Sequence, residues 1–193
     1  MQKDKGLLPA MILAIICIIA TALLAFTNQI TLPTRLAQEE AAENENKLAL
    51  FPEAQDFRDI DIEPYLEQLP DLTAAYEVYG PDGEELGTLF AAAARGYGGD
   101  VPIMAAVNAE GKLSGVRIMA NEETPGLGKK IDEQEFLSQF VDKDISIRYS
   151  TKIGDPGKEV IDSVSGATIS SRAVTESLNE GLELYSQISG GES

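Results

Sequence analysis

The residues from 162 to 171 combine small side chains with hydroxyl groups, directly before a long helical pattern. Gly166 has no Cβ and Ala167 has only a methyl group, so a phosphate can approach the backbone closely there. The first N–H groups of a helix lack partners within the helix, and the helix dipole favours an anion at that end. Four side chains add hydroxyl groups that can donate hydrogen bonds or carry a phosphoester: Ser165, Thr168, Ser170 and Ser171. The stretch is a candidate phosphate site, although a serine-rich turn that caps a helix has the same composition.

The neighbouring segments predict that this stretch is a loop between a short strand and a helix. Val160 and Ile161 form a short apolar piece before it. After it, apolar residues recur at spacings of three and four and so share one helix face: Val174, Leu178, Leu182, Tyr185 and Ile188. The sequence therefore predicts a helix that begins at about Ile169 and presents its N-terminus to the loop.

Two glycine-containing loops are further candidates for contact with a ligand. Gly-Tyr-Gly-Gly at residues 96–99 lies between predicted strands, where glycine permits close approach by a ligand that Tyr97 could contact. The second loop, residues 121–128, presents backbone N–H groups along a path that Pro125 and two glycines restrict. Its candidate ligand-contacting residues are Thr124, Gly126, Leu127 and Gly128. By composition alone, these loops can equally be an ordinary bulge and an ordinary turn.

Three motifs in order resemble those of the covalent-FMN proteins. Asp162, Ser165, Gly166, Ala167 and Thr168 resemble the flavinylation motif of the G subunit of the Rnf complex and the related C subunit of the sodium-pumping NADH:quinone reductase. The loops at 96–99 and 123–128 are similar to FMN-domain motifs of the same subunits. The resemblance implies that Thr168 carries FMN through a phosphoester and that both loops contact the flavin. The compact length is more similar to the Rnf subunit.

The resemblance also implies partners. A threonine hydroxyl is a poor nucleophile near neutral pH, and no histidine is present to activate it. The implied agent of attachment is a separate flavin transferase that uses FAD and a metal ion outside the membrane, and Asp162 is expected to help it recognise or activate the acceptor. The other expected partners are the membrane and peripheral subunits of an Rnf-type complex. No catalytic residue and no metal site is expected in the chain itself.

Composition excludes several classes of function. The formal net charge of −17 and the pI of about 4.3 argue against a nucleic-acid partner. Without histidine there can be no Ser-His-Asp or Cys-His arrangement and no histidine-ligated metal. The single cysteine, Cys17, cannot form an internal disulfide.

An uncharged segment near the N-terminus predicts a membrane anchor. Residues 7–26 carry no charge, and about 20 helical residues span roughly 30 Å, the thickness of a bilayer core. Ala-Thr-Ala at residues 20–22 fits a signal-peptide cleavage site, but the apolar run continues beyond it, which favours an uncleaved anchor. Lys3 and Lys5 precede the span and an acidic run follows it. The positive-inside rule therefore predicts a single-pass protein of the cell (inner) membrane, with everything after about Asn28 outside.

The rest of the chain predicts an α+β domain on a stalk. Thr34 is expected to cap a stalk helix that ends before Pro52. Residues 63–69 are expected to form a second short helix. Strands are expected at 75–79, 85–94, 103–107, 113–119, 145–149 and 160–161, with a helix at 131–141. Hairpins followed by helices predict an antiparallel sheet with helices packed on one side. We therefore expect an anchor at 1–28, a helical stalk or linker at 29–70 and an extracytoplasmic FMN-binding domain at 71–193.

Three classes of function are compatible with these features. The first is an electron-transfer subunit of an Rnf-type complex that couples ferredoxin:NAD electron transfer to ion translocation, with the C-type quinone-reductase subunit as its nearest alternative. The second is an independent flavin reductase, which the lack of histidine disfavours. The third is an anchored sensor that binds FMN reversibly, which the acceptor motif disfavours because reversible binding needs no hydroxyl there. The sequence favours the first class.

Overall fold

The structure is a computed structural model, and it describes residues 7–189. The chain divides into two compact units, Met1–Asn44 and Glu45–Ser193. The first unit is the larger part of one helix, α1 (Leu7–Leu50). The second unit, called the sheet domain below, begins with the last turns of α1 and contains every other element. Lys3 and Lys5, on which the predicted membrane orientation rests, lie outside the described residues.

Helix α1 is a candidate membrane span. It is long and apolar enough to cross a bilayer, and none of its apolar window is buried inside the protein, which excludes a soluble core helix. The expected new helix at Thr34 is wrong, because α1 continues through Pro33. Proline has a helical φ, so the helix loses one backbone hydrogen bond there without having to end. The predicted end before Pro52 is confirmed, since α1 ends at Leu50.

Six antiparallel strands form the main sheet, in the order β1-β2-β3-β4-β5-β6. Their bounds are β1 Asp56–Asp59, β2 Leu72–Tyr79, β3 Glu85–Arg95, β4 Asp100–Asn108, β5 Lys112–Ile118 and β6 Lys143–Asp144. A separate parallel pair joins β7 (Tyr149–Ser150) to β8 (Glu159–Val160). The two predicted hairpins are confirmed as β2–β3 and β4–β5. The predicted strand at 145–149 is wrong, because only its last residue, Tyr149, lies in a strand.

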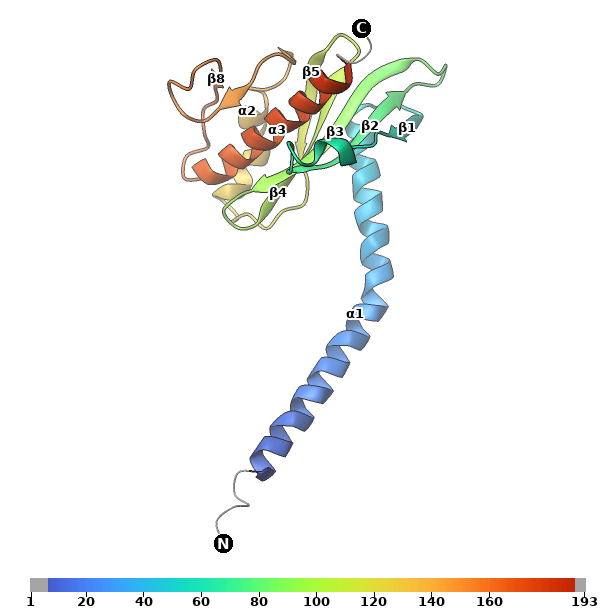
Figure 1. The fold of residues 1–193 in the computed structure, drawn as a ribbon, viewed down its shortest axis with the longest axis vertical. Helices are drawn as coiled ribbons and strands as arrows, with labels where there is room; N and C mark the ends of the chain where they lie inside the picture. The colour runs from blue at the N-terminus through green and yellow to red at the C-terminus, as the bar shows by residue number, and fades with distance from the viewer. Residues whose placement is uncertain (1–6, 190–193) are drawn as a thin grey trace. The chain divides into compact units, whose positions relative to one another are not determined.

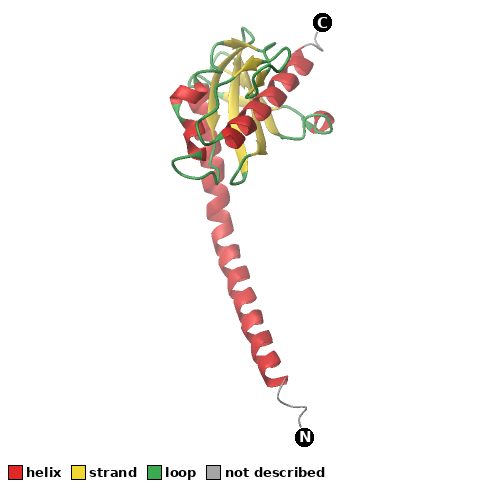
Figure 2. Ribbon diagram, turned by 90° about the vertical axis from the view of Figure 1, so that its left-hand side faces the viewer, coloured by secondary structure: helices red, strands yellow, loops and turns green. Residues whose placement is uncertain are grey.

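The helices of the sheet domain are one long helix and several short turns. Helix α3 (Thr168–Ser189) runs across one face of the sheet (Figure 1), and the strands lie behind it as one layer in the turned view of Figure 2. The helix predicted at 131–141 is broken into a 3₁₀ turn, η2 (Gly128–Asp132), and the short α2 (Gln134–Leu137). In the region of the second predicted stalk helix, only the 3₁₀ turn η1 (Glu63–Tyr65) forms.

The main core lies between α3 and the sheet. The predicted apolar face of α3 is confirmed, with Val174, Leu178 and Leu182 fully buried. Phe140 and Tyr149 close one end of this core with their rings edge to face, 5.1 Å between centroids. A buried hydrogen bond from the N–H of Ala94 in β3 to Ser177 Oγ, 2.9 Å, fixes α3 along the sheet. The N-terminus of α3 is thereby held at one end of the strands.

The other face of the sheet is covered by the last turn of α1, within the sheet domain. Lys47 is 8% exposed, and its Nζ lies 3.4 Å from the centroid of the Tyr76 ring, a cation–π contact. Arg117 Nε in β5 donates a hydrogen bond to Asn46 Oδ1 at 2.9 Å. The sequence predicted a mostly solvated stalk here, so this second, smaller core was missed.

Candidate functional site

The predicted phosphate loop is a tight turn at the start of α3. The N–H of Ala167 donates to the carbonyl of Val164 at 2.9 Å, and Gly166 at the third turn position has a φ of +78°. A positive φ at this position is typical of a type II turn and favours glycine. The N–H of Val164 also donates to Ser171 Oγ at 3.0 Å, which ties the turn to the helix that follows it.

The first turn of α3 presents free backbone donors at this loop. Thr168 is the first residue of the helix, and the first intrahelical bond runs from the N–H of Ser171 to the carbonyl of Ala167, 2.9 Å. The N–H groups of Thr168, Ile169 and Ser170 have no acceptor among residues 7–189. Unpaired donors at the positive end of a 22-residue helix form an anion-binding position.

The structure separates the four candidate hydroxyl groups. Ser170 and Ser171 are 1% and 0% exposed, and both hydroxyl groups form hydrogen bonds inside the protein. Ser165 and Thr168 are exposed. Within the described chain, the exposed Thr168 hydroxyl has no hydrogen-bond partner, so it is accessible from solvent.

Most of the predicted site residues meet around one half-open cavity of about 450 Å³. The predicted residues that line it are Tyr97, Thr124, Leu127, Gly128, Gly166, Ala167 and Thr168. Glu123, Ile169 and Ser170, which were not predicted to contact a ligand ring, complete the wall. Three large apolar side chains in this wall remain exposed: Tyr97 at 73%, Leu127 at 50% and Ile169 at 41%. The cavity thus combines apolar walls with the anion-binding helix end.

Three predicted residues lie elsewhere. Asp162 and Ser165 line a neighbouring cavity of about 420 Å³, together with Lys130, Phe136 and other residues. Gly126 lies in the wall of neither cavity. It has a φ of +78°, and a Cβ at this position would meet nothing within 4 Å. The predicted phosphate loop therefore lies between two cavities, with Thr168 at one and Asp162 at the other.

Glu123 is the residue that the sequence prediction missed. It is 2% exposed, and its Oε1 accepts hydrogen bonds from the N–H groups of Tyr97, 2.7 Å, and Gly98, 3.1 Å. Its Oε2 accepts a hydrogen bond from Ser170 Oγ at 2.9 Å. Glu123 is the first residue of the 123–128 run that resembles the FMN-domain motif, but the resemblance gave it no role, and the composition of the loop does not show that its side chain is buried. The structure leaves Glu122 exposed.

Two glycines make room for this carboxylate. A Cβ built at Gly96 would collide with Glu123 Oε1, and a Cβ built at Gly128 would collide with Glu123 Oε2. Gly128, predicted as a flavin-contacting residue, lines the cavity and also packs against Glu123. Larger residues at either position would displace the side chain that joins the loops.

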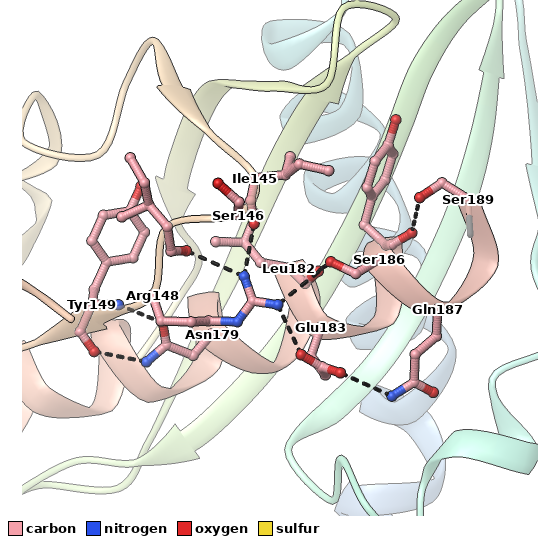
Figure 3. A network of polar contacts seen from close by, with 12 residues as sticks. Ile145, Ser146, Arg148, Tyr149, Asn179, Leu182, Glu183, Ser186, Gln187 and Ser189 are labelled. Carbon is pink, nitrogen blue, oxygen red and sulfur yellow. Dashed lines mark hydrogen bonds and ion pairs between the residues drawn. The ribbon is translucent and has the colours of Figure 1, made fainter. Parts of the chain in front are cut away.

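A polar network fixes the middle of α3 to the segment before β7 (Figure 3). Arg148 donates to Glu183 Oε2 at 2.8 Å and to the carbonyl of Ile145 at 2.7 Å, and its hydrogen bond lowers the pKa of Glu183. Asn179 closes the network with two hydrogen bonds of 2.8 Å, to the N–H and the carbonyl of Tyr149. Tyr149 is buried, which raises its pKa, and its hydroxyl has no partner in the described structure.

No group of three or more His, Cys, Asp or Glu side chains within residues 7–189 is arranged to hold a metal ion. The candidate site is therefore built from backbone donors, one free hydroxyl group, apolar walls and one buried carboxylate. This donor set suits a ligand that carries a phosphate and a flat apolar ring.

Two protein families match the chain. The FMN-binding domain family matches residues 96–183, and the RnfG N-terminal region matches residues 6–46. Among characterised proteins, the chain is similar to the G subunit of the proton-translocating ferredoxin:NAD(+) oxidoreductase complex of Clostridium ljungdahlii, with 30% identity over 93% of this chain and 91% of that protein. It is also similar to the G subunit of the Na(+)-translocating ferredoxin:NAD(+) oxidoreductase complex of Acetobacterium woodii, with 27% identity over 93% of this chain and 91% of that protein.

Solved structures match part of the chain. The C subunit of the Na(+)-translocating NADH-quinone reductase from Parabacteroides distasonis is 27% identical, with a TM-score of 0.47, over 58% of this chain and 60% of that chain. NqrC of Shewanella oneidensis is 22% identical, with a TM-score of 0.45, over 56% of this chain and 54% of that chain.

Proposed function

The chain belongs to the family of G subunits of Rnf-type ion-translocating oxidoreductase complexes, and on this premise we propose that it carries electrons through such a complex on an FMN attached to Thr168. It is a redox subunit with an FMN-binding domain and a single N-terminal membrane helix. In the proposal, the complex couples electron transfer between ferredoxin and NAD to ion translocation. Its other membrane and peripheral subunits are the partners of this chain.

The observation that carries the proposal is the position of Thr168. Among the hydroxyl groups of the acceptor loop, residues 162–171, it is the exposed one that also lines the cavity with Tyr97 and Leu127, because Ser170 and Ser171 are buried and Ser165 lines the neighbouring cavity. The free N–H groups of α3 surround the same position and suit the phosphate of FMN. Tyr97, Leu127 and Ile169 supply apolar walls for the ring, and Gly166 keeps the approach open.

The proposed linkage is a phosphoester between Thr168 Oγ and the phosphate of FMN. In the attachment step, the Oγ–P bond forms, the anhydride bond of an FAD donor breaks, AMP leaves and the hydroxyl proton is released. A threonine hydroxyl needs a base or a metal to become a nucleophile, and the chain contains no histidine. We therefore assign the step to a separate flavin transferase that supplies the metal ion.

When bound, FMN supplies reversible electron transfer, and the residues of the chain control where this takes place. The N-terminal donors of α3 bind the phosphate, and Thr168 prevents loss of the cofactor to the medium. Leu127 and Ile169 exclude water from one side of the ring position, while Thr124 and Gly128 offer backbone groups to its edge. The chain has no catalytic role of its own in the proposal.

We also propose a membrane anchor at 1–28, a linker that begins at residue 29 and an extracytoplasmic FMN-binding domain; the linker was predicted to end at residue 70, but the sheet domain begins at Glu45 and includes β1. Lys3 and Lys5 before the span support a cytoplasmic N-terminus by the positive-inside rule. An impermeant protease added to cells stripped of any outer barrier should digest everything after about residue 30. Protection of the sheet domain until the membrane is permeabilised would contradict the orientation.

The proposed function can be tested by purifying the complex through an affinity tag on this chain. The expected result is co-purification of other integral membrane subunits and a flavin-fluorescent band at the mass of this chain after denaturing electrophoresis. Addition of reduced ferredoxin to the native preparation should bleach the flavin absorbance. A chain that purifies alone and releases all its flavin on denaturation would instead support a reversible FMN-binding sensor.

A further inference from the structure

Glu123 joins three segments that lie far apart in the sequence. Its two carboxylate oxygens accept hydrogen bonds from Tyr97 and Gly98 in one loop and from Ser170 in α3, at 2.7, 3.1 and 2.9 Å. Glu123 itself belongs to the third segment, the loop before η2. No described Lys or Arg forms an ion pair with it, so these donors must stabilise the carboxylate.

The position of Glu123 explains how a carboxylate without a basic partner can be buried there. Ser170 is the third residue of α3, so the carboxylate lies at the positive end of the helix dipole, where negative charge is favoured. Hydrogen bonds to a charged acceptor are about twice as strong as those between neutral groups. A fully buried carboxylate held in this way is rigid, because any movement leaves a charge without donors.

Glu123 also contributes to the cavity wall, where it is the one charged lining residue within the described chain. A negative charge close to a redox group opposes the addition of electrons, and the effect is larger away from bulk water. The same side chain can therefore act on the site twice, through the positions of the loops and through its charge.

We propose that Glu123 is the positioning residue of the flavin site. It holds Tyr97, Leu127 and Thr168 at fixed separations before flavin is attached, and its charge lowers the midpoint potential of the flavin afterwards. The inference about the attached cofactor rests on the proposed function. The inference about the loops concerns the chain alone and holds whether the flavin is covalent, reversible or absent.

The first test measures amide hydrogen exchange in the full chain without flavin, in detergent. Tyr97 is 73% exposed, yet its N–H and that of Gly98 should be protected by Glu123. Glu123→Ala should accelerate exchange at both amides by roughly tenfold to a hundredfold, the effect of losing a hydrogen bond to a charged group. Glu122→Gln, an exposed neighbour, is the matched control and should change neither amide.

Glu123→Gln distinguishes a positioning role from general stability. The amide oxygen can still accept from Tyr97 and Gly98, and the Ser170 hydroxyl can turn to accept a hydrogen bond instead, so protection of both amides should be largely retained. Unchanged exchange at Tyr97 and Gly98 in Glu123→Ala would overturn the proposal. If Glu123→Ala also accelerates exchange at the buried amides of β4, the whole domain is destabilised and the Glu123→Gln variant becomes the test. Retained protection of the Tyr97 and Gly98 amides in Glu123→Gln then supports the positioning role, and loss of that protection excludes it.

The second test measures the midpoint potential of the flavin-loaded chain. Glu123→Gln should shift the potential to a more positive value, because a negative charge is removed while the shape is kept. Glu122→Gln, which loses the same charge at an exposed position, should shift it much less. Equal potentials in wild type and Glu123→Gln would overturn the electrostatic part, and an equal shift in both variants would show that only net charge matters. Failure of flavin attachment itself would contradict the proposed function and leave the exchange result valid.

Discussion

The side-chain amide of Gln139 forms two hydrogen bonds with the backbone of Asp162. The N–H of Asp162 donates to Gln139 Oε1 at 2.8 Å, and Gln139 Nε2 donates to the carbonyl of Asp162 at 3.1 Å. The pair fixes the point at which the chain enters the acceptor loop. The segment after α2 therefore positions this end of the loop, while Ser171 fixes the other end through Val164.

Gln139→Ala should loosen the entry to the acceptor loop. Both hydrogen bonds are lost, and because they are partly exposed the expected loss of stability is about 1 kcal/mol. The amide of Asp162 should exchange faster, and the yield of attached flavin under limiting transferase should fall. Gln134→Ala, on the exposed side of α2, is the matched control. If Asp162 exchanges at the same rate in both variants, the pair does not hold the loop.

Gly126→Ala and Gly128→Ala should have different effects although the glycines are two residues apart. Gly126 has a φ of +78° and open space beside it, so alanine there should cost about 1 kcal/mol through backbone strain alone. Alanine at Gly128 would meet the Glu123 carboxylate, an overpacking that costs about 1–3 kcal/mol. Only Gly128→Ala should also accelerate amide exchange at Tyr97. A normal Tyr97 amide in Gly128→Ala would contradict the described packing.

Tyr149→Phe should leave the stability unchanged or raise it slightly. The hydroxyl of Tyr149 is buried without a partner in the described structure, and removing such a group relieves a desolvation cost. The edge-to-face contact with Phe140 does not need the hydroxyl. Chemical denaturation of the two proteins measures the difference. A loss of more than about 1 kcal/mol would show that the hydroxyl is satisfied by a partner such as a buried water.

The stability of the sheet domain should fall in acid partly because of Glu183. Hydrogen bonds from Arg148 and Gln187 lower its folded pKa below the ordinary value of 4.5. A lowered folded pKa contributes stability above the unfolded pKa, and that contribution is lost as the pH falls through the folded pKa. Glu183→Gln should therefore differ most from wild type at neutral pH, and the difference should shrink below about pH 4.5.

The control for this pH dependence is Glu135→Gln, which removes an exposed carboxylate from α2. Denaturation midpoints measured from neutral pH into acid should show a shallower acid dependence for Glu183→Gln than for the control. Equal dependence on pH in wild type and Glu183→Gln would show that the Arg148 contact adds no pH-dependent stability.

Local patterns in the sequence predicted the parts of the fold that depend on periodicity and turn chemistry. The hairpin turns at Gly83 and Gly111 follow from glycine at positive φ, and the buried face of α3 follows from the spacing of Val174, Leu178 and Leu182. The sequence also predicted that Thr168 lies at the start of a long helix and near the two glycine-containing loops, and Thr168 does line the cavity with residues of both loops. The assignment of ligand roles to these residues stays a prediction.

The remaining features depend on tertiary contacts that no local pattern encodes. Glu123 is buried only because donors from residues 97, 98 and 170 converge on it. Strand β1 has no apolar alternation and exists because β2 offers an edge with which it pairs. Residues 145–148 look like a strand by composition, but Arg148 uses the local carbonyl groups for its own hydrogen bonds. The sequence predicted Lys47 to be a solvated stalk residue, because its cation–π contact with the Tyr76 ring depends on a strand far away in the sequence.

The most direct test of the account is the intact mass of the denatured chain, produced together with a flavin transferase and FAD. The wild-type chain should carry one added FMN less one water, and Thr168→Ser should carry the same addition because it keeps the hydroxyl. Ser165→Ala should also be fully loaded, since its hydroxyl lies at the other cavity. Thr168→Val, which exchanges the hydroxyl for a methyl group at an exposed position, should fold normally and show the mass of the polypeptide alone. An FMN adduct that survives in Thr168→Val, or a wild-type chain without any adduct, would contradict the central claim.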